Sequence, residues 1–327
     1  MKRLDTLVLG ICIFLCITSG QAFAGEVLSG NAKAMLQEDL KLYDFYKTNS
    51  YSLELCSEKC PGKRSAIDNA SAALVSLLDN AISSVRGRQH ERVNFAEHDA
   101  MLKEKVALQF AGCSPCTDVV QRVNTYSAEG LPESVARVAL LHSERYAQNP
   151  EFEFEDGLTR SVAYRWSAHG KSRKCLLNIP ETWSKDVAGS TPRTQVFRSA
   201  LGNGIPFFSI TYMPVNRMPT EDAAHKFLLK RVAQSALERE YGSVEVLAQG
   251  VHMLGSAKSI WVIFNADGKF DRGPGYFYNW YILFDGTLLT FHSGVSDNAS
   301  EIHVEHEELF RKYYQTLREI AQSSVIR

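Results

Sequence analysis

The 327-residue chain is 45% hydrophobic and has a formal net charge of −1, from 36 basic and 37 acidic residues. Its length and hydrophobic content suffice for one large or two ordinary domains, and we expect two. The balanced charge provides no overall field that would attract nucleic acid or anionic lipid, so we exclude proteins that bind polyanions through their net charge.

The N-terminal segment has the pattern of a cleavable secretory signal. Lys2 and Arg3 precede an uncharged run over residues 6–17, and small residues follow at Ala22 and Ala24. This run is shorter than the roughly 20 residues that span a bilayer, and neither early cysteine follows the small residues of a lipoprotein signal. We therefore expect residues 1–24 to be removed, giving a periplasmic or secreted protein with no transmembrane segment in the mature chain.

Residues 25–150 are expected to form a helical domain. Apolar residues recur there at spacings of three and four, which indicates amphipathic helices. Ser65 begins the pattern of a capping box, and Ser114 followed by Pro115 is typical of a helix start. The expected helices cover about residues 36–47, 52–59, 65–82, 94–111, a stretch from 114 through 123, and 132–148.

Four cysteines of this half, Cys56, Cys60, Cys113 and Cys116, predict disulfides in an exported protein. Three pairings are possible, and cross-links between the two pairs would close loops of about 55 residues and contribute about 4 kcal/mol each. The alternative is a thiol-disulfide oxidoreductase, because a Cys-Ser-Pro-Cys motif at a helix start lowers a thiol pKa. Against it, no βαβ unit surrounds the motif. Cys175 is expected to be a buried thiol, or to pair between molecules.

An acidic-aromatic segment at 151–158 is expected to link the helical domain to an α+β domain over 159–327. There the hydrophobic period changes to two, and Asp285-Gly286 is a strong hairpin signal. Runs of strands around two helices predict an antiparallel sheet packed by both. The strands are expected at 161–168, 173–179, 194–201, 206–213, 244–251, 259–265, 276–284 and 287–293, and the helices at 220–242 and 304–323.

This second half resembles a known fold. The matching pieces are the hexapeptide from Asn178 to Trp183, after the first hairpin, and the tetrapeptide from Asp285 to Leu288, before the last helix. With the order of strands and helices, they resemble the PsbP/Mog1-like fold, which includes bacterial DcrB-like envelope proteins. The resemblance covers 159–327 and leaves the helical half unassigned. It implies accessory or binding work, with no catalytic residues to transfer.

Two groups of side chains in the second half are candidate sites. His303 and His306 have a spacing that can share a metal, but an exposed acidic first turn explains the same residues, and we assign no metal. Tyr276, Tyr278 and Trp280 alternate along one strand and form a possible ligand platform for a peptide or glycan. A strand buried on both faces accounts for them equally well.

No serine nucleophile elbow or Walker-type phosphate loop is present in the sequence, and we predict no catalytic residue and no cofactor. The sequence thus favours an exported, non-catalytic binding or accessory protein of the cell envelope, with an envelope or extracellular protein or a glycan as its partner. The oxidoreductase using Cys113 and Cys116 is the alternative.

Overall fold

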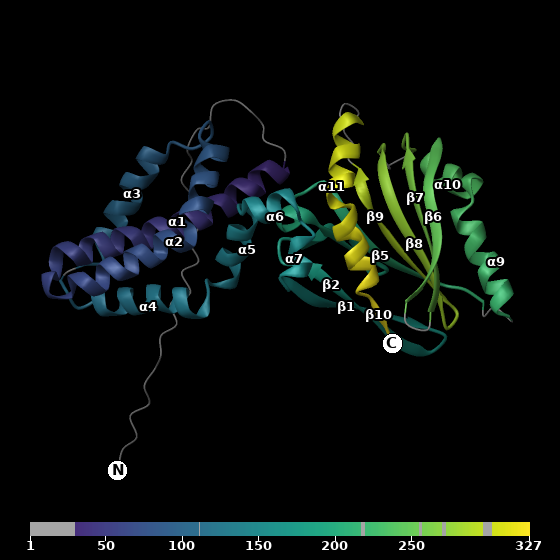
Figure 1. The fold of residues 1–327 in the computed structure, drawn as a ribbon, viewed down its shortest axis with the longest axis horizontal. Coiled ribbons are helices and arrows are strands. Elements are labelled where there is room, and N and C mark those ends of the chain that lie inside the picture. The colour runs from purple at the N-terminus through teal and green to yellow at the C-terminus, as the bar shows by residue number, and fades with distance from the viewer. Residues whose placement is uncertain (1–29, 111, 217–219, 255–256, 270–272, 297–302) are drawn as a thin grey trace, which may run out of the picture.

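The computed structural model describes residues 30–110, 112–216, 220–254, 257–269, 273–296 and 303–327, so the predicted signal segment lies outside it. A helical half is followed by a half rich in strands (Figure 1). The fully buried apolar residues of the helical core end at Val138, and those of the strand-rich cores begin at Tyr164. The predicted α+β class with an N-terminal helical region is therefore confirmed.

The helical half packs two long helices against several shorter ones around an apolar core that includes Leu42, Leu74 and Val123. Its elements are α1 (Gly30–Lys59), the 3-10 turn η1 (Pro61–Lys63), α2 (Arg64–Gln89), α3 (Phe95–Ala107), α4 (Cys116–Glu129), α5 (Glu133–Leu141) and α6 (Glu144–Gln148).

α1 is one continuous helix, so the expectation of separate helices at 36–47 and 52–59 is wrong. The intervening polar residues bond within the helix. The Asn49 amide donates to the carbonyl of Phe45 at 2.7 Å, and the Ser52 hydroxyl donates to that of Thr48 at 2.7 Å. Because these side chains are satisfied by the preceding turn, the polar stretch does not end the helix.

Other predicted helix boundaries also shift, and the helix expected over 94–111 ends at Ala107. α2 begins at Arg64, with Lys63 as an N-cap that makes no side-chain bond, so the capping box expected at Ser65 does not form. α4 begins at Cys116 and places Pro115 at the N-cap position. The helix expected over 132–148 is divided into α5 and α6 at His142, which has a bridge-region backbone and a side chain turned into the core.

The segment predicted as a linker contains the short helix α7 (Phe152–Glu155). Glu153 is 1% exposed, and its carboxylate accepts hydrogen bonds from the Thr182 amide at 3.0 Å and hydroxyl at 2.5 Å. Phe154 packs against the core of the strand-rich half. This segment is therefore attached to the second half, while the division into independent domains stays a prediction.

Glu153→Gln is expected to stabilise the protein at neutral pH. Burial raises the pKa of the Glu153 carboxyl above its ordinary value, although hydrogen bonds from Thr182 oppose the shift. A folded-state pKa above the unfolded one favours the protonated acid, so the stability from this group is complete below the unfolded pKa and lost as pH rises through the folded pKa. Urea unfolding followed by tryptophan fluorescence should show the advantage of the variant growing from pH 4 to pH 7. An advantage independent of pH would contradict the assignment.

The strand-rich half contains two antiparallel sheets. The first has the order β1-β2-β10 and the second the order β3-β4-β5-β9-β8-β7-β6. Asp285 and Gly286 both have positive φ, 44° and 71°, and form the predicted tight turn between β8 and β9. The strands are β1 (Thr159–Ala168), β2 (Lys171–Pro180), β3 (Ser184–Thr191), β4 (Thr194–Arg198), β5 (Pro206–Pro214), β6 (Val244–Leu254), β7 (Ala257–Ala266), β8 (Gly275–Phe284), β9 (Thr287–Ser296) and β10 (Val325–Ile326).

Helices cover both faces of the seven-stranded sheet (Figure 1). α11 (His303–Gln322) packs on one face against β8 and β9, together with the small sheet, whose β1 contacts β5. α9 (Glu221–Val232) and α10 (Gln234–Tyr241) cover the other face. The helix expected over 220–242 is interrupted at Ala233, which has an extended backbone. The strand expected over 194–201 ends at Arg198. The four-residue turn α8 (Ser199–Gly202) follows it, and Ala200 and Leu201 have left-handed backbone there.

One arginine joins the two halves. Arg137 of α5 donates from Nε to the carbonyl of Glu181 at 2.7 Å, and from its terminal nitrogen to the carbonyl of Trp183 at 2.9 Å and the hydroxyl of Ser184 at 2.7 Å. Leu201 of α8 packs in turn against the helical core. These contacts fix α5 to the segment that leads into β3.

Candidate functional site

A groove lies between α11 and the β6 side of the large sheet. α11 packs on β8 and β9, whereas β7 and β6 follow β8 toward the edge of the sheet. The helix therefore does not cover β6 or the adjoining part of β7. The groove has a volume of about 400 Å³ and is lined by residues of β6, β7, β8 and α11: Glu245, Leu247, Asn265, Tyr276, Glu307, Phe310 and Arg311.

The floor of the groove is aromatic. The rings of Tyr276 and Phe310 stack with centroids 5.8 Å apart and an interplanar angle of 30°. Tyr276, Tyr278 and Trp280 alternate along β8 and share one face, as predicted from their spacing. Only Tyr276 lines the groove, because Tyr278 and Trp280 are 2% and 1% exposed beneath α11. The structure therefore limits the accessible part of the predicted platform to Tyr276.

Two carboxylates form the polar rim. The Tyr276 hydroxyl donates to Oε2 of Glu307 at 3.2 Å, and Arg311 donates to the other oxygen of the same carboxylate. On the opposite side, Asn265 Nδ2 donates to Glu245 Oε2 at 2.9 Å. Burial raises the pKa of Tyr276, as do its bond to Glu307 and the nearby negative charges. The phenol is therefore a permanent donor at neutral pH.

The two carboxylates of the rim, Glu245 and Glu307, differ in whether a basic side chain forms an ion pair with them. Glu307 is paired with Arg311 one turn along α11. Glu245 is exposed, and within the described ranges no lysine, arginine or histidine forms an ion pair with it. The groove thus offers a stacked aromatic floor and one carboxylate without a cation of its own, which is an arrangement suited to a ligand with an apolar body and a positive group.

The residues of this groove, apart from Tyr276, have no sequence pattern that identifies them. They come from four elements, and their closeness depends on the β6–β7 register, in which Glu245 lies opposite Asn265, and on where α11 crosses the sheet. The one local signal is the four-residue spacing of Glu307 and Arg311, which is an ordinary helix pair.

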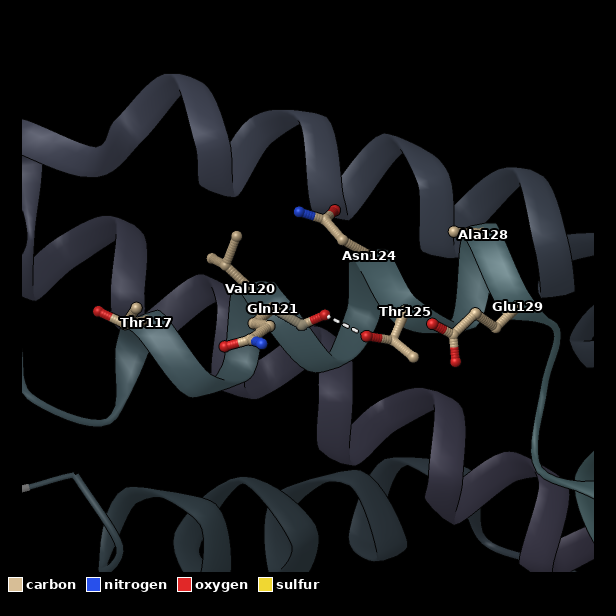
Figure 2. Close-up of a pocket in the computed structure, with 7 residues that line it drawn as sticks. All are labelled: Thr117, Val120, Gln121, Asn124, Thr125, Ala128 and Glu129. Carbon is tan, nitrogen blue, oxygen red and sulfur yellow. Dashed lines mark hydrogen bonds between the residues drawn. The ribbon is translucent and has the colours of Figure 1, made fainter.

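A second hollow, of about 430 Å³, lies along α4 and is open to solvent (Figure 2). Its residues come from one helix, and the hydrogen bond drawn there runs from the Thr125 hydroxyl to the carbonyl of Gln121, one turn back. No aromatic ring lines it. This hollow therefore lacks the aromatic floor that the groove beside α11 offers a ligand.

The cysteines are paired between the two motifs. Cys56 bonds to Cys116 and Cys60 bonds to Cys113, which joins the end of α1 to the start of α4. A thioredoxin-like site would instead pair Cys113 with Cys116. Cys175 is buried in β2, and burial raises the pKa of its thiol to about 12, so it is unreactive at neutral pH.

His303 and His306, the two candidate metal ligands, both belong to the first turn of α11. His306 is buried in the first turns of α11, while the His303 side chain lies outside the description. Among the described side chains, no group of three or more His, Cys, Asp or Glu is arranged to hold a metal ion. No helix in the described part of the chain is long and apolar enough to cross a membrane.

Three hydrogen-bonded side chains in the helical half, a serine, a histidine and an aspartate, have the composition of a hydrolase triad. His142 Nδ1 shares a hydrogen bond with the Ser84 hydroxyl at 2.9 Å, and His142 Nε2 donates to Asp39 at 2.9 Å. The side chains of His142 and Asp39 are fully buried, and the Ser84 amide lies inside α2, where it cannot stabilise an oxyanion. These hydrogen bonds link α1, α2 and the residue that ends α5.

No protein-family model and no curated protein matches the chain. Similar solved structures include the cyanobacterial PsbP (CyanoP) of Synechocystis sp. PCC 6803, at 15% identity and a TM-score of 0.32, covering 52% of this chain and 96% of that one. Another is a Pseudomonas aeruginosa protein of unknown function described as a putative regulator, at 13% identity and a TM-score of 0.24, covering 48% and 95%. At these values neither likeness supports an inference about function, and the PsbP/Mog1-like fold stays a resemblance.

Proposed function

We propose that the protein is an exported, non-catalytic binding or accessory protein of the cell envelope, and that the groove beside α11 receives its partner. Two disulfides support the location, because such bonds persist in oxidising compartments and are rare in the cytosol. The predicted secretory signal leads to the same compartment.

The observation that carries the proposal is the stacked pair Tyr276–Phe310 under a hydrogen-bonded rim. Both oxygens of Glu307 accept hydrogen bonds, one from Tyr276 and one from Arg311, and these bonds hold the carboxylate in one orientation at the rim of the groove. An aromatic floor with orienting polar groups is typical of sites that recognise ligands.

Affinity capture from the organism's own envelope extract tests the proposal. A partner retained by the tagged wild-type mature protein should be recovered about tenfold less with Tyr276→Ala, which corresponds to about 1.4 kcal/mol of binding free energy. Tyr126→Ala is the matched control, because Tyr126 is also half-buried and also packs on a phenylalanine, at 5.1 Å from Phe45 in the helical half. Equal recovery with both variants, or no specifically retained protein, would refute the groove as the binding site.

A further inference from the structure

We infer that the partner binds as an extended segment that adds a strand to the free edge of β6 and places a lysine or arginine against Glu245. This inference rests on the proposed function and specifies the chemistry of the partner. It is carried by the edge of the sheet, by the Glu245 carboxylate, which has no ion pair among the described residues, and by the contrast between the two edge strands.

β6 is a long edge strand whose acidic residue, Glu245, and register shift both lie near its start. It has 11 residues and is the last strand of its sheet, so among the described strands only β7 pairs with it. Residues 248–254 contain no proline and no Asp, Glu, Lys or Arg. Val251 and Met253 project from one face and are each 53% exposed. At the start of the strand the Val244 carbonyl accepts a hydrogen bond from Gln234 Nε2 at 3.4 Å. Beyond it, the outward backbone groups of an edge strand flanked by apolar side chains are a template for strand addition.

The other edge of the same sheet, β3, is protected. Its pairing with β4 loses register between Asp186 and Thr191, so the strand is irregular along its middle. Lys185 and Asp186 add charges, and Asp186 is held by Arg198 at 2.9 Å. Irregular pairing and charge are the usual means by which proteins prevent edge-to-edge association. In β6 the register shift and Glu245 come before residue 249, so most of that edge has neither protection.

The groove begins where β6 bulges. The β6–β7 register shifts between Val246 and Ala248, and Leu247 at this shift is 47% exposed and lines the groove. Further along, the indole of Trp261 lies over the backbone of Gly250, where an added Cβ would be 2.6 Å from the ring. An incoming strand therefore meets an apolar side chain and an indole on the same side as the groove.

The negative charge of Glu245 favours a partner segment with a basic residue. A residue directly opposite Glu245 on an added strand would have its Cβ about 4.5–5.5 Å away on the same face. Because Glu245 has no cation among the described residues, a lysine or arginine at that place would form a new ion pair at the rim of the groove. Residues of the opposite alternation would contact Val251 and Met253, which favours apolar side chains there.

Panning a displayed library of random dodecapeptides on the disulfide-intact mature protein tests the inference. We expect enrichment of peptides with alternating apolar residues and a lysine or arginine, and each enriched peptide is then synthesised and titrated by calorimetry. Val251→Lys should weaken its binding by about tenfold or more, because charge blocks an edge strand. Val187→Lys on β3 is the matched control, since Val187 is 80% exposed on the other edge, and it should leave binding unchanged. Glu245→Lys should reverse the preference from a basic to an acidic peptide.

Several outcomes would overturn the inference. These are the absence of enrichment, enrichment without a basic residue, or equal effects of Val251→Lys and Val187→Lys. A dimer in analytical ultracentrifugation that Val251→Lys abolishes would assign the edge to a second copy of this chain instead. Binding lost in Tyr276→Ala but retained in Val251→Lys would refute strand addition while leaving the proposed groove intact.

Discussion

Removing both disulfides should unfold the helical half while the strand-rich half stays folded. The bridges Cys56–Cys116 and Cys60–Cys113 span sequence separations of 60 and 53, and one is nested inside the other. The first bridge to form therefore restricts a long loop and contributes about 4 kcal/mol, whereas the second closes a ring of only about eight residues and adds about 2.5 kcal/mol. Replacing one pair by alanine should cost about 2.5 kcal/mol, and replacing both about 6.5 kcal/mol, which is comparable to the total stability of an ordinary domain.

The two halves can be observed separately in this experiment. All four tryptophans lie in the strand-rich half, at positions 166, 183, 261 and 280, so their fluorescence reports that half alone. Ellipticity at 222 nm is dominated by the helices. In the variant without either bridge, much of the ellipticity should be lost at 37 °C while the tryptophan transition keeps its midpoint. An equal shift of both signals would show that the chain unfolds as one unit, contrary to the predicted domain division.

The reduction potentials of the two disulfides distinguish a structural role from the oxidoreductase alternative. Structural disulfides have reduction potentials below about −300 mV, whereas exchange enzymes lie between about −270 and −120 mV. We expect both bridges to resist glutathione buffers. Peptide mapping that found a Cys113–Cys116 bridge, readily reduced in those buffers, would contradict the pairing in the structure and support an oxidoreductase.

Local signals account for most of the predicted fold. The β8–β9 hairpin was predictable because Asp285-Gly286 suits a turn with two positive φ values, and α11 because its apolar residues recur along one face. β3 was not predicted, since its side chains are mostly exposed and lack an apolar alternation. β10 is two residues long and exists only through pairing with β2. Such elements depend on tertiary contacts that a local pattern does not contain.

The groove was less predictable than the fold. Alternation along β8 placed Tyr276, Tyr278 and Trp280 on one face, but which of them stays accessible depends on where α11 lies. The cysteines show the same limit. Their spacing indicated disulfides, and the packing of α1 against α4 selects one pairing among three.

Replacing Asp39 by alanine should be the most damaging single substitution in the helical half. Asp39 is fully buried, and its carboxylate accepts from Gln89 at 2.7 Å and from His142 at 2.9 Å, with Arg88 at 3.7 Å. It thereby joins α1 to α2 and to the end of α5. Without it, a buried amide and a buried imidazole lose their acceptor, and breaking such a network by removing one partner costs about 3–5 kcal/mol.

Thermal and urea unfolding followed at 222 nm measure this cost, and Asp68→Ala is the matched control, because Asp68 is an exposed aspartate on α2. The control should change the free energy of unfolding by no more than about 0.5 kcal/mol. Adding His142→Phe to Asp39→Ala should recover part of the loss, since it removes one of the unsatisfied groups and keeps a ring in the same space. Two results would show that the buried network does not hold these three helices together. Asp39→Ala could lower the free energy of unfolding no more than the control does, or His142→Phe could lower it as much in the Asp39→Ala background as it does alone.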